Sequence, residues 1–311
     1  MFVDIISLFL MLIFSLVSVG FLTLMERKIL GFIQIRKGPL KVGFLGIFQP
    51  FSDALKLFSS EFFFPLNSNF NLYWVSPLVM LLISMIVWLS FPYWYIVLSW
   101  KYSLIFMLIV LSMSVYPVMA CGWSSNSSYS MLGCLRVIAQ SVSYEVSFFL
   151  LIMTFIYMIG SMKILDYLSF QYNTWFIILI FPIFIMLLVS LLAELNRTPF
   201  DFSEGESELV SGFNIEYGGS GFAFSFLGEY LSILFSSTLI VILFLGSLNS
   251  HNLFFLKIMM VTFIIIILRG TLPRYRYDKL MNLCWKSFLS CSIFMIMFYT
   301  SLFYFKQYSV N

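Results

Sequence analysis

Apolar stretches with almost no charged residues recur along this sequence, and they constrain its fold more than any other feature. Hydrophobic residues make up 61% of the chain, well above the roughly 45 to 50% of soluble proteins. A helix of about 20 apolar residues crosses about 30 Å of hydrocarbon. We therefore expect an all-α integral membrane protein in which residues 1–311 form a single membrane domain. Eight stretches suit transmembrane helices, the seventh being the shortest: 5–24, 72–91, 102–121, 137–159, 175–193, 222–245, 253–268 and 287–305.

The distribution of basic residues predicts the orientation. An even number of spans places both termini on one side, so the connecting segments fall into two sets. The segments after the first, third, fifth and seventh spans hold thirteen Lys and Arg residues, whereas the opposite set holds four. Lys and Arg are enriched in loops on the cytoplasmic side of membranes. We expect the first set on that side, which corresponds to the matrix in a mitochondrion. The opening "MFVDIISLFL" carries an acid instead of the basic start of a signal peptide and predicts a retained first helix.

Three of the connecting segments on the basic side are long enough to have structure of their own. The first loop, 25–71, has apolar residues at helical spacing after Pro50 (Phe51, Leu55, Phe58 and Phe62). This pattern predicts an amphipathic helix at the membrane interface, although such a helix could simply anchor the loop. In the basic loop, 269–286, the cations are either topological anchors or partners for acids of other loops; Arg274 and Arg276 are the candidates for the second role.

The acidic loop, 194–221, is the least expected feature of so apolar a chain. The segment "AELNRTPFDFSEGESELVSGFNIEY" (193–217) holds six of the fourteen acids within 23 consecutive positions. An EF-hand loop is excluded, because its D-x-[DN]-x-[DN]-G order is absent. Phe and Leu residues alternate with the acids, which favours a loop folded against protein with its carboxylates turned inward over a merely solvated one.

Glu145 lies within the fourth span, near the middle of the membrane. An ionised acid at such depth costs about 2.5 to 3.5 kcal/mol. Loss of hydration favours the neutral form, so a reversible proton carrier is physically reasonable. The alternative is an acid that packs against a neighbouring subunit.

Two further acids lie within or at the end of other spans. Glu229 sits about two turns inside the sixth span and Glu194 closes the fifth. Three carboxylates at graded depth are typical of a water-bearing proton relay. Polar residues at helical spacing (Arg136, Gln140, Ser143 and Ser147) predict a polar flank that leads from the basic side toward Glu145.

No metal site is expected from this chain alone. Its four cysteines have no CxxC spacing and its one histidine, His251, lies in an opposite-side loop. The net charge of +3 reflects orientation, and nucleic-acid binding is not expected.

Five motifs spread in order over the chain resemble the subunit 1 family of NADH:ubiquinone oxidoreductase, respiratory complex I. They are "MERKILGFIQIRKGP" (25–39), "QPFSDALKLF" (49–58), "SYEV" (143–146), the acidic-loop segment and "RGTLPRYRYDKLM" (269–281). The acidic-loop motif is the most specific. Leu40 replaces a usual asparagine and Leu195 a usual threonine, and neither change removes a charged position.

The resemblance implies a subunit at the junction of the membrane arm and the peripheral arm, forming the entrance and wall of a quinone tunnel. Residues implied in the tunnel are Glu26, Arg27, Arg36, Asp53, Ala54, Phe226 and Tyr230. The implied proton-transfer chain comprises Asp53, Glu145, Glu194, Asp201, Glu204, Glu206, Glu216 and Glu229. Countercharges are expected from Arg136, Arg197, Arg274 and Arg276.

The resemblance also implies that ubiquinone is the substrate and that NADH, FMN and iron–sulfur clusters are bound by partner subunits. No complete active site or bound cofactor is expected in this chain alone. The implied partners are quinone-site subunits of the peripheral arm, small membrane-arm subunits and lipids, in the mitochondrial inner membrane with the acidic and basic loops facing the matrix. Two alternatives stay open: a self-contained proton or cation transporter, which lacks an evident inverted repeat, and an inert anchor for a redox enzyme.

Overall fold

The computed structural model describes residues 2–91, 100–172, 174–202, 205, 212–246 and 251–310, and this part of the chain contains helices and no strand. The α-helices are α1 (Phe2–Ile33), α2 (Gln49–Ser59), α3 (Phe70–Val87), α4 (Ser103–Met113), α5 (Val115–Ser124), α6 (Ser128–Ile159), α7 (Ile164–Phe170), α8 (Phe176–Leu179), α9 (Phe181–Glu194), α11 (Gly219–Ile240), α12 (His251–Thr271), α13 (Tyr277–Asn282) and α14 (Leu289–Val310). π-Helical turns continue α11 over Val241–Leu245 and link α13 to α14 over Leu283–Phe288.

Within the described residues, seven helical segments are long and apolar enough to cross a membrane. They correspond to seven of the eight predicted spans. The predicted span 175–193 is instead divided into α8 and the 14-residue α9. Proline lacks an N–H and is favoured in the first turn of a helix, so Pro182 fits the restart of the helix at Phe181. The count of eight crossings therefore stays a prediction at this span.

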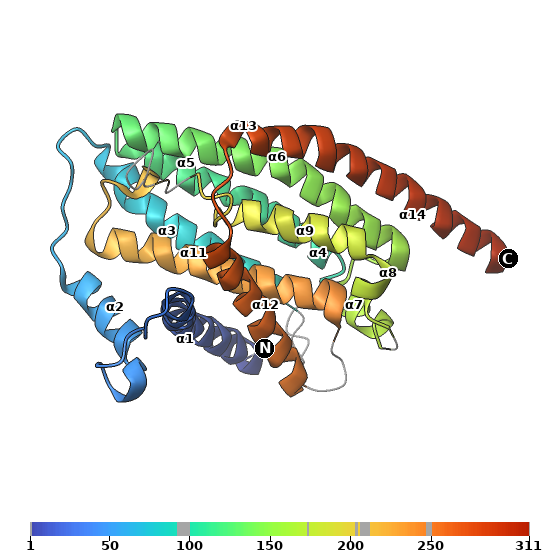
Figure 1. Ribbon diagram of the computed structural model, residues 1–311, viewed down its shortest axis with the longest axis horizontal. Helices are drawn as coiled ribbons and strands as arrows, with labels where there is room; N and C mark the ends of the chain where they lie inside the picture. Colours follow the sequence, from blue (N-terminus) through green and yellow to red (C-terminus); the bar gives the residue numbers. More distant parts are fainter. Residues whose placement is uncertain are drawn as a thin grey trace.

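α11 forms the centre of the bundle. Figure 1 shows it running through the middle, with α6 and α14 along one side and α1 and α2 along the other. Of an apolar stretch of 18 residues in the segment that contains α11, 78% are buried. The corresponding share for the segment that contains α14 is 6%. The largest fully buried side chains include Tyr144, Phe155, Leu187, Leu231 and Phe244.

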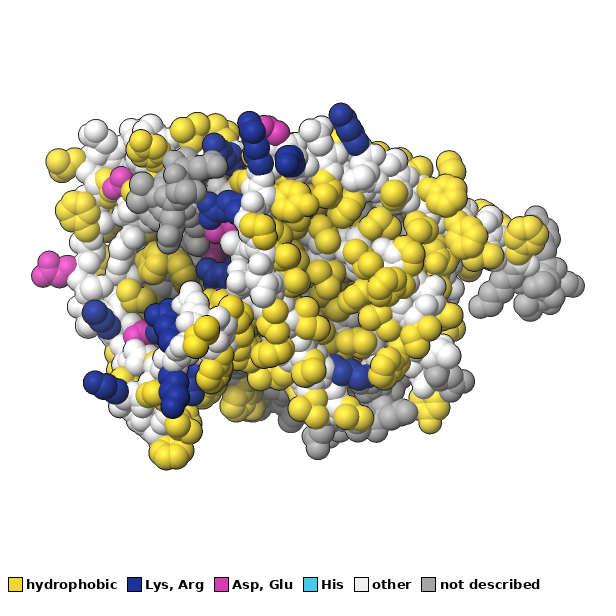
Figure 2. All heavy atoms as spheres, in the orientation of Figure 1, with side chains coloured by type: hydrophobic (Ala, Val, Ile, Leu, Met, Phe, Trp, Pro, Cys, Tyr) yellow, Lys and Arg dark blue, Asp and Glu magenta, His cyan; other side chains and the backbone are white. Residues whose placement is uncertain are grey.

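The outer surface is largely apolar. Figure 2 shows hydrophobic side chains over much of the visible face, with most Lys and Arg residues gathered near α1, α2 and the start of α13. Such a surface is costly in water and suits a bilayer. It agrees with the prediction of a multi-pass membrane protein.

A helix is present where the first loop was predicted to form one. Phe51 packs edge-on against Phe21 of α1, with ring centroids 6.0 Å apart, and Phe58 packs against Phe224 of α11 at 5.7 Å. No residue of α2 is fully buried. Its position at a membrane interface stays a prediction.

The predicted basic loop, 269–286, is more helical than expected. α12 continues to Thr271 and α13 begins at Tyr277. Only residues 272–276 between these helices lack helical structure, so the basic side chains project from two helix ends and a short connection.

Candidate functional site

Three helices converge on the carboxylate of Glu26. Its side chain, on α1, is buried, and its Oε2 accepts a 2.6 Å hydrogen bond from the Tyr230 hydroxyl on α11. Its Oε1 forms an ion pair with Arg269 in the last turn of α12. A buried carboxylate is costly unless it is paired and hydrogen-bonded. Here both oxygens have a partner, and the cluster links residues more than 200 positions apart.

Arg197 connects this cluster to the next acid. After α9 ends at Glu194, Asn196 adopts a φ of 50°, a left-handed conformation that asparagine tolerates. The turn directs Arg197 into the protein, where its guanidinium lies 4.7 Å from the centre of the Tyr230 ring. Its Nη2 is 3.5 Å from the Glu229 carboxylate, and the arginine is only 6% exposed.

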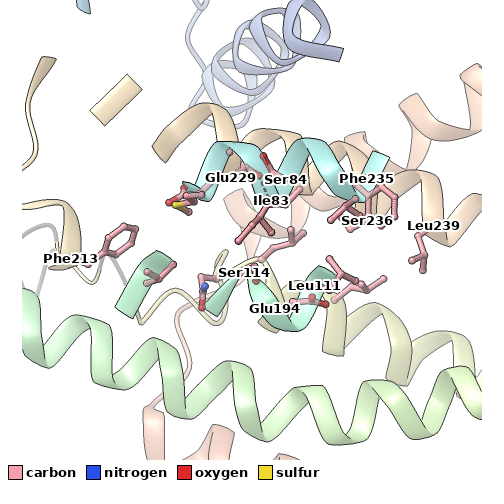
Figure 3. Close-up of a pocket in the computed structure, with 18 residues that line it drawn as sticks. Ile83, Ser84, Leu111, Ser114, Glu194, Phe213, Glu229, Phe235, Ser236 and Leu239 are labelled. Atoms are coloured by element: carbon pink, nitrogen blue, oxygen red, sulfur yellow. Dashed lines mark hydrogen bonds between the residues drawn. The ribbon is translucent and has the colours of Figure 1, made fainter. Parts of the chain in front are cut away.

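A cavity of about 90 Å³ lies beyond Glu229. Figure 3 shows Glu229 and Ser84 on one side of this cavity and Glu194, Ser114 and Leu111 on the other. Ser232 and Ser236 of α11 add hydroxyl groups to an otherwise apolar lining. The volume exceeds the roughly 10 to 15 Å³ that one water needs, and the wall offers several polar partners.

A second cavity of about 50 Å³ adjoins the first and contains Glu145. Leu111, Ser114 and Glu194 line both cavities. Ser112 and Ser141 lie with Glu145 in the second cavity. The structure thus brings together the three carboxylates predicted at graded depth. Glu145 is exposed at the outer surface of this chain, so one side of it is open to lipid or to another subunit.

The predicted polar flank of α6 does not lead to Glu145. Gln140, Ser143 and Ser147 are fully buried on a different face of the helix. Ser143 contacts Cys284 through its carbonyl oxygen, at 2.9 Å. Five residues separate Gln140 from Glu145, a rotation of about 140° around a helix of 3.6 residues per turn. Ser141, one turn before Glu145, shares its face.

The first part of the acidic loop is held between α6 and the basic segment. The Gln140 side-chain amide donates to the carbonyl oxygens of Ala193 and Phe200, at 2.7 and 2.9 Å. Asp201, 9% exposed, lies 3.1 Å from Arg274. The loop is folded inward here, as its apolar residues indicated. Glu204 and Glu206 lie outside the described residues.

The implied tunnel residues of the first loop form a separate pair. Asp53 on α2 lies 2.5 Å from Arg27 and accepts a 2.9 Å hydrogen bond from Gln49. Arg36 and Ala54 are exposed. Phe226 lies on α11 one turn before Tyr230, with ring centroids 6.3 Å apart.

Three other predicted site residues lie away from the Glu26 cluster. The main-chain oxygen of Glu216 accepts a hydrogen bond from Tyr73, and its side chain is half-buried. Arg136 is half-buried on α6. Arg276 pairs with Asp278, two residues further along, and both side chains are mostly exposed.

Sequence reasoning missed the position of Arg269. The spacing along α12 marks it only as a cation at a helix end, the usual place of a topological anchor. Its partner is 243 positions away. No local pattern indicates such a contact, although a buried acid on α1 requires a partner of some kind.

Comparison with known proteins identifies relatives over nearly the whole chain. A family model described as NADH dehydrogenase matches residues 6–300. The chain is 53% identical over 290 residues to "NADH-ubiquinone oxidoreductase chain 1" of Aedes aegypti, with 93% of each chain covered. It is 52% identical over 302 residues to the protein of that name in Locusta migratoria, with coverage of 97% and 96%. For Notamacropus eugenii the identity is 41% over 305 residues, with 96% of each chain covered.

Proposed function

This chain belongs to the NADH dehydrogenase family, as a membrane subunit of NADH:ubiquinone oxidoreductase, respiratory complex I, and we propose that it forms the entrance and membrane-side wall of the quinone tunnel. We further propose that its carboxylates couple quinone reduction to proton translocation. Its partners are then the quinone-site subunits of the peripheral arm and small subunits of the membrane arm. The acidic and basic loops face the matrix, at the mitochondrial inner membrane.

One observation supports the coupling role above all others: ionisable groups and cavities follow one another from Glu26 to Glu145. Tyr230 contacts Glu26, and Arg197 contacts both Tyr230 and Glu229. The two cavities then place Glu194 between Glu229 and Glu145. An isolated structural ion pair would explain one of these contacts but not the whole row.

The coupling follows from electrostatics. Partner subunits supply the electrons, and ubiquinone takes up protons as it is reduced. Carboxylates that lie close together cannot all be ionised, so their protonation is coupled. Protonation or deprotonation near the quinone therefore changes the charge favoured at the next acid along the row. The serines and any water in the cavities provide hydrogen-bonding partners for proton movement.

Replacement of Glu194 or Glu145 by Gln tests this role in the assembled complex. Each variant keeps the shape of the side chain but removes its exchangeable charge. We expect proton pumping with ubiquinone to fall about tenfold or more, since positioned acid–base groups contribute about 10² to 10⁴ in rate. NADH oxidation by a hydrophilic acceptor that bypasses quinone should be unchanged.

Glu61→Gln is the matched control, because Glu61 is exposed on the first loop and lies outside the row. Normal pumping in all three variants would refute the carboxylate relay. The tunnel wall is tested separately with a photoreactive quinone in native membranes. Labelled peptides within 25–58 or 193–230 are expected, and labelling confined to other segments would contradict the tunnel assignment.

A further inference from the structure

We propose that Arg269 is a positioning residue that holds the Glu26 carboxylate against the Tyr230 hydroxyl and links this part of the proposed tunnel wall to the acidic loop. The inference rests on the proposed function. Arg269 lies within the motif 269–281, but the resemblance implies no role for it. In this role Arg269 acts through Glu26 and does not contact the quinone itself.

Each carboxylate oxygen of Glu26 has its own partner. Arg269 binds one oxygen of Glu26 while Tyr230 donates to the other. Glu26 is 5% exposed, so water cannot replace a missing partner fully. Without the arginine, a carboxylate with one remaining hydrogen bond would be left in a buried site, where it would lose the contact that fixes its orientation.

α12 approaches α1 closely beside Arg269. Gly270 follows Arg269, and a Cβ built there would lie 2.8 Å from Ile33 Cδ1 and 3.0 Å from Leu30 Cδ2. A side chain at this position would push the helices apart unless those two side chains moved. Gly270 therefore leaves room for the Ile33 and Leu30 side chains where α12 passes α1, directly beside Arg269.

Arg269 also contacts the acidic loop. Its carbonyl oxygen accepts a 3.2 Å hydrogen bond from the Thr198 hydroxyl. Thr198 follows Arg197, whose guanidinium lies over the Tyr230 ring. Glu26 and the start of the acidic loop are thus both bound to one residue. A change of charge at Glu26 acts directly on the Arg269 side chain, and Thr198 is hydrogen-bonded to the backbone of the same residue.

A double-mutant cycle in the assembled complex tests this role. The variants are Arg269→Gln, Arg269→Lys, Glu26→Gln and the double variant Arg269→Gln/Glu26→Gln. The measurements are KM and kcat for a soluble ubiquinone analogue, together with NADH oxidation by a hydrophilic acceptor as a measure of assembled enzyme. Lys279→Gln is the matched control, because Lys279 is an exposed cation on α13.

We expect Arg269→Gln to raise the quinone KM about tenfold, within the range of coupling between contacting residues, with oxidation by the hydrophilic acceptor preserved. Arg269→Lys should restore most of the lost affinity, since it keeps the charge. The double variant should have the KM of Glu26→Gln within about twofold, because Arg269 then has no carboxylate to position. If Arg269→Gln fails to assemble, the double variant still decides, since it leaves neither charge unpaired.

Two results would overturn the proposal: a double variant whose KM is the product of the two single effects, or an Arg269→Gln variant with lower assembly and unaltered KM. If Glu26→Gln raises KM while Arg269→Gln acts independently, the positioning role alone fails. If Glu26→Gln leaves all quinone kinetics unaltered, the proposed tunnel wall fails and the positioning role falls with it.

Discussion

The Arg274 guanidinium lies 3.1 Å from the Asp201 carboxylate, and this ion pair joins the acidic loop to the basic segment 73 positions further along the chain. The two segments also meet through their backbones, since the N–H of Tyr275 donates to the Pro199 carbonyl oxygen at 2.9 Å. Phe200 packs against the Tyr275 ring, with centroids 5.6 Å apart. The acidic loop is therefore anchored at its start by several kinds of contact.

Asp201→Asn should loosen this anchor. Asn keeps the side-chain size but removes the charge from the 3.1 Å contact with Arg274 in a partly buried site, so we expect a loss of about 1 to 3 kcal/mol. Faster hydrogen exchange at residues 196–202 in the assembled complex is the measurement. Asp278→Asn removes the exposed Arg276 pair, which is worth about 0 to 1 kcal/mol, and serves as the control. Equal exchange in both variants would contradict the anchoring role.

The apolar periodicity was sufficient to predict most of the helical architecture, and the apolar residues between the acids predicted the inward fold at the start of the acidic loop. It missed the break at Ile180, because an apolar run gives no sign of where a helix is interrupted when the flanking residues stay hydrophobic. Here Pro182 was the available signal. In the third predicted span, α4 ends at Met113 and α5 begins at Val115, an interruption that the apolar pattern did not indicate.

The residues of the candidate site could be predicted only where the free-energy cost of burying an acid marked them. Glu145, Glu194 and Glu229 stood out because an acid among apolar residues is expensive. Which cation pairs with which acid depends on how the helices cross, and the spacing of residues along the sequence does not give that information. Arg269 is the clearest case, since it approaches Glu26 from α12, and no pattern along the chain indicates that this helix lies beside α1.

Gln140→Leu should destabilise the junction of α9 and the acidic loop. The amide of Gln140 is fully buried and satisfies the carbonyl oxygens of Ala193 and Phe200. Leucine would remove the side-chain donor and leave these oxygens only their backbone donors, the N–H groups of Asn196 and Phe202, at a cost of about 1 to 3 kcal/mol. We expect thermal inactivation of quinone reductase activity at a lower temperature. The exposed Gln34→Leu is the control, and a Gln140→Leu enzyme with the same inactivation temperature as that control would disprove the prediction.

Tyr217→Phe should change stability at alkaline pH. The Tyr217 ring stacks on Tyr73 at 4.2 Å, and its hydroxyl hydrogen-bonds with Ser76 and Ser124, each at 3.1 Å. Burial, followed by the nearby Cys121, raises the pKa of Tyr217 above its usual value. The folded state thus retains this proton more strongly than the unfolded state. Its contribution is fully present below about pH 10 and is lost as pH rises through the folded pKa.

The Tyr217 variant should therefore be less stable than the parent at neutral pH, by about 1 to 3 kcal/mol for the hydroxyl partners left unsatisfied. The difference should shrink above pH 10, because the variant lacks the group that titrates. Thermal inactivation measured between neutral pH and pH 11 checks both parts. Tyr172→Phe, at an exposed tyrosine, should show neither effect, and a Tyr217→Phe difference that is constant with pH would rule out the titration.

Lys257→Met should weaken the end of α11 opposite the carboxylates. The Lys257 ammonium donates to the carbonyl oxygens of Leu245 and Gly246 and lies 4.8 Å from the centre of the Trp175 ring. The last carbonyls of a helix lack partners within it, and a cation near them is favourable. Methionine keeps the apolar stem but leaves these oxygens without the donor, at about 1 to 3 kcal/mol. Thermal inactivation at a lower temperature is expected, with Lys257→Arg close to the parent and the exposed Lys163→Met unchanged. If Lys257→Met and Lys163→Met inactivate at the same temperature, the ammonium does not stabilise this helix end.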